Sequence, residues 1–169
     1  MQYALDEIDP FEEVSHPLDF VEETCASHQW DCHRASDDAV RIKVPGRYAE
    51  YAMMLMWEEE LNTLQFTAKL PLAFDPEHME QLPRALLDIN AQLWLGHFTL
   101  AEEKAVLFRH AVLFRGITGA SGFEHVEDLI TIAREECDRF FPFFQILQDR
   151  QTSSAEQLIL ALSDTEGAA

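Results

Sequence analysis

Three consecutive segments between residues 40 and 70 have the periodicity of β-strands, and this feature constrains the fold more than any other. Residues 40–44 read Val-Arg-Ile-Lys-Val and residues 64–70 read Leu-Gln-Phe-Thr-Ala-Lys-Leu, so apolar and polar side chains alternate. Such alternation is typical of strands with one buried face. Residues 48–57 between them are apolar on both faces. Because residues 45–47 and 58–62 suit short turns, the three strands are expected to pair antiparallel.

Helical periodicity flanks these strands on both sides. A first helix begins near Pro17, a residue type suited to the first turn of a helix. A second helix is expected after residues 75–76, with an apolar stripe that runs from Leu82 to Leu93. Pro83 falls inside this stripe, so the second helix either kinks there or truly starts there.

A third helix is expected behind a capping box formed by Ser121 and Glu124. Its apolar side continues for several turns, and Pro142 should bend or end it. A short amphipathic helix is expected around residues 155–162. These elements give the chain two long helices and a short one after the central strands.

The remaining strands complete the fold prediction. Trp30 opens the first of four consecutive strands, and two more are expected at residues 97–101 and 105–115. The resulting order is α-β-β-β-β-α-β-β-α, with the short last helix as a possible addition. An antiparallel sheet with helices packed on one face belongs to the α+β class.

The length of 169 residues indicates one domain with short tails. Residues 1–15 are acidic with spaced apolar residues, and we expect a flexible N-terminal arm. Residues 16–150 form the expected α+β domain. Residues 151–169 are expected to hold the short C-terminal helix and a loose tail.

A net charge of −19 limits the partners of the chain. Such a charge repels nucleic-acid phosphates and anionic membranes, so neither is an expected partner. A basic partner or simple solubility fits the charge better. The opening residues do not have the pattern of a signal peptide. The cysteines are odd in number (Cys25, Cys32 and Cys137), which favours a reducing compartment. We therefore expect a cytoplasmic location.

Cys25, His28, Cys32 and His33 lie close in sequence and are candidate zinc ligands. Their spacing, C-x2-H-x3-C-H, matches no common structural zinc pattern. If the strand begins at Trp30, its alternation sends Cys32 and His33 to opposite faces. The sequence therefore predicts no metal site at this cluster.

Other candidate chemistry is equally sparse in the sequence. The acidic triplet at residues 58–60 falls in a predicted turn, where water solvates the carboxylates. The Gly-rich residues 116–122 precede a helix but lack the lysine of a phosphate-binding loop. Nucleophile elbows and His-Glu metal motifs do not occur in the sequence. We expect neither an enzyme nor a cofactor.

His97 and His110 sit on the two strands that follow the second helix. If these strands pair, the two rings could be neighbours, and a hydrogen-bonded structural pair is the favoured interpretation. Together with Trp94 and Arg109, they are candidate lining residues of a pocket between sheet and helices.

Met54, Met56 and Trp57 are the candidate partner or dimer surface. Because residues 48–57 are apolar on both faces, either helices cover both faces or one face awaits a partner. Methionine-rich surfaces suit adaptable binding because the side chain is flexible and polarizable. The sequence therefore predicts a protein-binding surface on this strand.

Residues 90–98, Asn-Ala-Gln-Leu-Trp-Leu-Gly-His-Phe, carry a signature that resembles that of the YbjN family of bacterial sensory transduction regulators. Residues 44–51, of the form V-x-G-R-x-x-x-Y, and the helical residues 135–140 also resemble this family. The resemblance covers about residues 16–165 and looks closest to the alphaproteobacterial branch.

The resemblance implies a fold similar to that of type III secretion chaperones, which are usually dimeric and bind partner segments along their surface. It implies no catalytic residue. Within the signature, Gly96 is expected to end the second helix in a left-handed conformation. Trp94 and Phe98 are expected to pack across that corner, and His97 to hydrogen-bond nearby backbone.

These observations predict a non-enzymatic protein-binding domain, chaperone-like or regulatory, that forms a homodimer and has an unidentified protein partner. The alternative is a small-molecule-sensing domain with its pocket between the sheet and the helices.

Overall fold

The computed structural model describes residues 16–74, 81–101, 104–117 and 119–148. Within these ranges the elements follow the order α-β-β-β-β-α-β-β-α, which confirms the predicted order and the α+β class. Their bounds are α1 Pro17–His28, β1 Asp31–Ser36, β2 Ala39–Pro45, β3 Glu50–Glu58, β4 Thr63–Lys69, α2 Leu82–Asn90, β5 His97–Leu100, β6 Val106–Leu113 and α3 Gly119–Gln148. The predicted arm at residues 1–15 and the predicted tail at 151–169, with its helix, lie outside the described residues.

The strands form one antiparallel sheet in the order β1-β2-β3-β4-β6-β5. The first four strands are neighbours in sequence as well as in space, as their short turns require. The chain then leaves the sheet through α2, enters the edge as β5, and returns as β6 beside β4.

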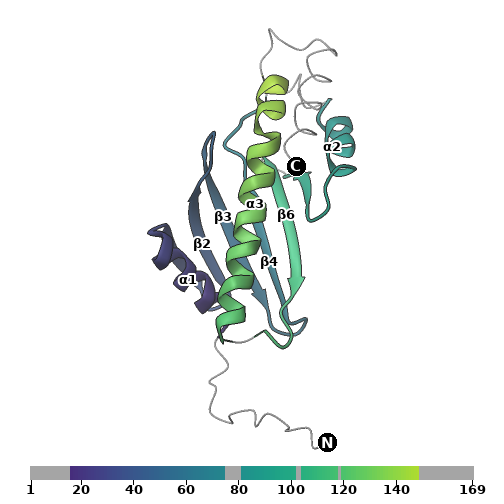
Figure 1. Ribbon diagram of the computed structural model, residues 1–169. Coiled ribbons are helices and arrows are strands. Elements are labelled where there is room, and N and C mark those ends of the chain that lie inside the picture. The colour runs from purple at the N-terminus through teal and green to yellow at the C-terminus, as the bar shows by residue number, and fades with distance from the viewer. Residues whose placement is uncertain (1–15, 75–80, 102–103, 118, 149–169) are drawn as a thin grey trace, which may run out of the picture.

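Helices cover one face of this sheet. Figure 1 shows α3 running along the length of the sheet, with α1 beside it. The strand residues that alternate toward these helices are buried, as in β2, where Val40, Ile42 and Val44 are all core residues. This side therefore holds the hydrophobic core, and the other side of each strand faces away from it.

Aromatic rings hold α3 on the sheet. Phe98 of β5 packs edge-to-face against Phe140 and Phe144 of α3, with ring centroids 5.6 and 5.3 Å apart. It also meets Phe108 of β6 at 5.2 Å. All four rings are fully buried, and edge-to-face pairs contribute beyond the area that they bury.

The structure shows where the predicted second and third helices begin and end. α2 begins at Leu82 with Pro83 in its first turn, so Pro83 starts the helix and does not kink it. α3 begins two residues before the predicted cap at Ser121 and continues through Pro142, so of the two predicted effects of that proline, a bend or an end, the end is wrong. The proline is tolerated because the phenylalanines on both sides of it are buried: Phe140, Phe141, Phe143 and Phe144.

Asp138 of α3 fastens the turn between β2 and β3. Its two carboxylate oxygens accept the Arg47 backbone N–H at 2.8 and 3.0 Å, and Oδ1 also accepts the Tyr51 hydroxyl at 2.8 Å. Burial raises the pKa of Tyr51, and its hydrogen bond to Asp138 raises it further. A side chain at Gly46 would collide with both the Tyr51 ring and the carboxylate. The V-x-G-R-x-x-x-Y spacing of residues 44–51 thus has a folding role.

Asp138→Asn should lower the free energy of unfolding by about 1–3 kcal/mol, because it removes the charge from three hydrogen bonds at once. Urea denaturation measures the change. Asp88→Asn is the matched control, since Asp88 forms only an exposed pair with Arg84 in α2, and it should change stability by less than about 0.5 kcal/mol. Equal effects of the two substitutions would contradict this role of Asp138.

Candidate binding surface on the open face of the sheet

The face of the sheet opposite α1 and α3 is here called the open face. Its first transverse row follows from the strand register, because directly paired residues point to the same side. The row contains Arg41, Met54, Thr67, Arg109 and His97, each paired with the next. Arg41 is exposed, and the other side chains of this row are exposed or half-buried.

A second row runs parallel to the first and consists of Lys43, Ala52, Lys69, Leu107 and Thr99. The two lysines and the alanine between them are exposed. Lys43 pairs with acids at the margin of the face, with its Nζ 3.8 Å from a carboxylate oxygen of Asp31 and 3.6 Å from one of Glu50. Such exposed pairs contribute little to stability.

Met56 occupies a third row, between Ala39 and Gln65. Its exposed fraction is 49%, which is high for a methionine on a sheet. Together with Met54 it forms an apolar centre in the open face. An apolar centre bordered by polar groups is the usual anatomy of a protein interface.

The charge of the open face is opposite to that of the chain. Four of the chain's 12 Lys and Arg lie in its rows: Arg41, Lys43, Lys69 and Arg109. The net charge of the whole chain is −19, so the acidic surplus lies elsewhere. The open face is therefore a local cationic field on an acidic protein, and local fields decide which ligands a face attracts.

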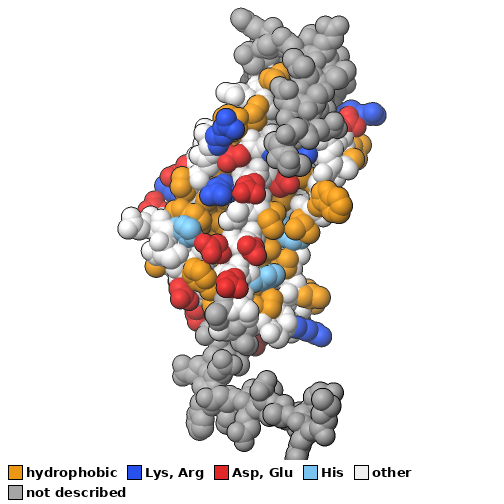
Figure 2. Space-filling model, in the orientation of Figure 1, with side chains coloured by type: hydrophobic (Ala, Val, Ile, Leu, Met, Phe, Trp, Pro, Cys, Tyr) orange, Lys and Arg blue, Asp and Glu red, His pale blue; other side chains and the backbone are white. Residues whose placement is uncertain are grey.

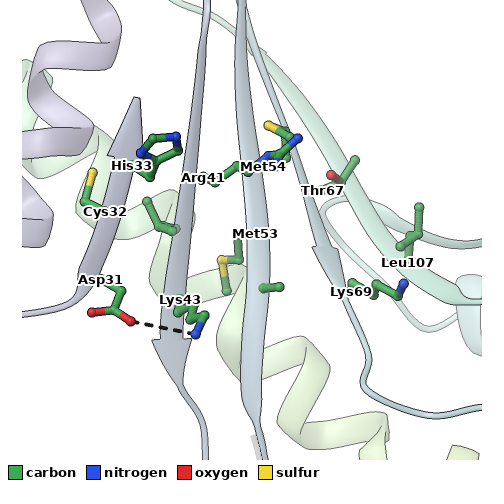
Figure 3. A pocket seen from close by; sticks show the side chains of 12 residues that line it. Asp31, Cys32, His33, Arg41, Lys43, Met53, Met54, Thr67, Lys69 and Leu107 are labelled. Atoms are coloured by element: carbon green, nitrogen blue, oxygen red, sulfur yellow. Dashed lines mark ion pairs between the residues drawn. The ribbon is translucent and has the colours of Figure 1, made fainter. Parts of the chain in front are cut away.

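A groove of about 1000 Å³ lies on this face (Figure 3). Its lining side chains come from β1 to β4 and from β6, and include His33, Arg41, Lys43, Met54, Thr67 and Lys69. Arg41 and Met54 lie side by side across β2 and β3, and the Lys43 amine lies toward Asp31. The groove offers cations and a thioether together, which suits a ligand with both carboxylates and apolar groups.

Of the predicted surface residues, Met54 and Met56 lie on the open face, but Trp57 does not. Trp57 alternates to the helix-covered side, where its ring packs edge-to-face against Phe114 with centroids 6.3 Å apart. Neighbours in a strand point to opposite faces, so grouping Trp57 with Met56 was wrong. The candidate surface keeps the methionines and gains the cations.

The structure does not bring the predicted pocket residues together. His97 pairs with Arg109 on the open face, whereas His110 lies on the other face, edge-to-face with Phe66 at 5.8 Å. Arg109 donates a hydrogen bond to Gln65 Oε1 at 3.3 Å. Trp94 is 94% exposed.

The candidate zinc ligands do not form one group. His28 pairs with Glu127 at 2.6 Å and stacks on Trp30. Register places Cys32 opposite Ile42 and His33 opposite Arg41, so the two lie on opposite faces as predicted. Cys25 and Cys32 are neighbours, and burial together with Cys32 raises the pKa of Cys25 to about 12. Among the described residues, no three His, Cys, Asp or Glu side chains are grouped to hold a metal ion.

The acidic triplet at residues 58–60 is exposed at the turn after β3, as predicted. In the Gly-rich segment, Gly122 lies inside α3, where an added side chain would collide with the Phe20 ring of α1. This glycine therefore permits close packing of α1 against α3.

The signature at residues 90–98 folds around Asn90. Its Oδ1 accepts the Phe98 backbone N–H at 2.7 Å, and its Nδ2 donates to the Phe98 carbonyl at 2.9 Å. The side chain thus ties the end of α2 to β5, a role that the sequence analysis missed. Gly96 is left-handed, but α2 ends earlier, at Asn90. A side chain at Gly96 would collide with the Phe108 ring.

The fold and this surface define a two-layer α+β domain that presents one face of its sheet to solvent. The chain belongs to the YbjN family, whose model, described as "Putative bacterial sensory transduction regulator", matches residues 17–145. The predicted family is therefore confirmed.

Among solved structures, the crystal structure of YbjN from E. coli is similar to this chain, with a TM-score of 0.49 and 13% sequence identity. The similarity covers 72% of this chain and 85% of that one. No curated protein matches the sequence. None of the helices that the structure describes combines the length and apolarity needed to cross a membrane.

Asn90→Ala should lower the free energy of unfolding by about 1–3 kcal/mol, because it leaves the Phe98 N–H and carbonyl without partners at a half-buried site. Trp94→Ala is the control within the same signature. Because Trp94 is 94% exposed, its removal should change stability by less than about 0.5 kcal/mol. Urea denaturation compares the two, and a larger effect at Trp94 would contradict the assignment.

Stability should also depend on pH through His110. Burial lowers the pKa of His110 below 6.5, and the charge of His97 across the sheet lowers it further. The unfolded chain then binds this proton more readily than the folded one, so stability falls as the pH drops through 6.5 toward the folded pKa. His110→Gln should make the loss of stability on acidification smaller, whereas the exposed control His33→Gln should leave it unchanged. Denaturation midpoints measured across this pH range test the expectation.

Proposed function

We propose that this chain is a non-enzymatic regulator that acts by binding a segment of another protein on the open face of its sheet. The observation that carries the proposal is the apolar centre formed by Met54 and Met56 within a cationic border. Membership in a family described as sensory transduction regulators supports the regulatory part.

The chemistry of the face specifies the partner. Arg41 and Arg109 lie on either side of Met54 and Thr67 in the first row, and Lys43 and Lys69 flank Ala52 in the second row. A segment with apolar residues between carboxylates complements this arrangement. The net charge of the chain alone favoured a basic partner, but the local charge of the exposed face favours an acidic one.

A second copy of this chain fits the open face less well. In a two-fold dimer built on this face, the same patch meets itself, so the cations of one copy approach those of the other. Like charges across an interface cost several kcal/mol. The homodimer predicted for the surface of Met54 and Met56 stays a prediction, and this repulsion argues against it. Light scattering that finds a dimer, dissociated by Met56→Glu, would make a second copy the occupant and overturn the proposal.

The small-molecule alternative receives less support. It requires an enclosed space between the sheet and the helices, with polar groups that converge on it. That layer is occupied by buried aromatic rings, among them Phe66, Phe98 and Phe140. The groove lies on the opposite side of the sheet, where a chain segment can lie across several strands (Figure 3).

A fluorescent acidic peptide that alternates glutamate with leucine or phenylalanine should bind the full chain, and its lysine counterpart should not. Anisotropy titrations measure both affinities, and binding should weaken as salt screens the charges. The double variant Arg41→Glu with Arg109→Glu should lower the affinity at least about tenfold, because each reversal turns attraction into repulsion.

Arg84→Glu is the matched control, since Arg84 is an exposed arginine on α2 that pairs only with Asp88. It should leave the affinity unchanged, and circular dichroism confirms that each variant is folded. Equal binding of the two peptides would refute the proposal. The proposal would also be refuted if a DNA duplex bound more tightly than the acidic peptide and its binding depended on Arg41 and Arg109.

A further inference from the structure

The N-terminal residues of the chain have the chemistry that the open face should bind. Residues 1–15 contain no Lys or Arg and contain five carboxylates, which are Asp6, Glu7, Asp9, Glu12 and Glu13. Apolar side chains are spaced between these acids: Tyr3, Leu5, Ile8, Phe11 and Val14. The segment therefore combines negative charge with apolar groups, as the cationic border and the methionines of the open face require.

The attachment point of this segment lies on the helix-covered side of the sheet, near the edge strand β1. His16 caps α1, and its side chain accepts the backbone N–H of Leu18. Its ring packs edge-to-face against Trp57, with centroids 6.2 Å apart, and its Nδ1 lies 3.5 Å from an Arg34 nitrogen of β1. Trp57 directly follows Met56, so the segment is tethered at the end of the strand that carries the apolar centre.

The length of the segment suffices to cross the face. Fifteen extended residues span up to about 50 Å. Neighbouring strands lie about 4.8 Å apart, so the six-stranded sheet is about 24 Å wide. The segment can therefore pass around the edge at β1 and reach Lys69 on β4.

We infer that residues 1–15 occupy the open face of their own chain and compete there with the partner segment. The inference rests on the proposed function in one respect, namely that residues 1–15 and the partner segment bind the same surface. A tethered segment experiences an effective concentration in the millimolar range, so weak contacts are enough to populate the covered state. A partner must then displace the segment. Its acids and apolar groups must therefore bind the open face more strongly than those of residues 1–15 do.

Zero-length carbodiimide crosslinking of the full chain tests where the segment lies, because it joins only carboxylates and amines in contact. The chain has three lysines, of which Lys43 and Lys69 lie on the open face and Lys104 lies in the turn between β5 and β6. Mass spectrometry should find crosslinks from the acids of residues 1–15 to Lys43 or Lys69 and none to Lys104. Crosslinks of Lys43 to Asp31 and Glu50 serve as the positive control.

Methionine oxidation by dilute peroxide gives a second measurement on the same chain. Neutralising the five acids of residues 1–15 to Asn and Gln should release the segment and speed the oxidation of Met54 and Met56. Met53 is 3% exposed on the same strand and should oxidise slowly in both forms. An unchanged oxidation rate at Met54 and Met56 would overturn the inference.

Two other outcomes would also overturn it. One is crosslinking to Lys104 as extensive as that to Lys43 and Lys69, which would mean that the segment has no preferred site. The other is crosslinks found only between light and heavy isotope-labelled chains in a mixture, which would place the segment on a second copy. Because the segment competes with the peptide on the full chain, the titrations of the proposed function are repeated on the chain with the five neutralised acids, so each proposal can fail alone.

Discussion

The packing of α3 onto one side of the sheet is the interaction on which the rest of the structure depends. Phe140 and Phe144 meet Phe98 in an edge-to-face cluster, and this cluster sets which side of every strand is buried. A register slip of one residue would send Met54 and Arg41 into the core and expose their buried neighbours. The composition of the open face is thus fixed by the core, although none of its residues belongs to the core.

The polar residues of the family signature secure this packing. Asp138 joins α3 to the turn before β3, and Asn90 joins the end of α2 to β5. Both act through hydrogen bonds between elements that are distant or separated by a loop, where loss of one partner leaves buried groups unsatisfied. Asp138 and Asn90 therefore help to build the scaffold, and of the signature at residues 90–98 only His97 lies in the rows of the open face.

Local periodicity predicted the helices and strands and the buried face of each strand, because the alternation of apolar and polar residues is visible in a single sequence. It did not predict which strand residues meet. The pairing of His97 with Arg109 depends on the register of β5 and β6, which no local pattern specifies, so the expected contact between His97 and His110 was wrong. Trp57 was misplaced although alternation already assigned it to the buried face. The exposure of Trp94 was missed because the signature was interpreted as packing.

Net charge was the least informative property for the binding surface. It sums over the whole chain, whereas a ligand responds to charges within about 10 Å at moderate salt. Arg41 and Lys43 come from β2, Lys69 from β4 and Arg109 from β6, and the four cations form a field only when the sheet assembles. The net charge of the chain is −19, and Figure 2 shows acidic side chains along α3 on the helix-covered side, where they repel other acidic molecules. The surplus of acids therefore sharpens selectivity, because an acidic segment is attracted only where the open face presents its cations.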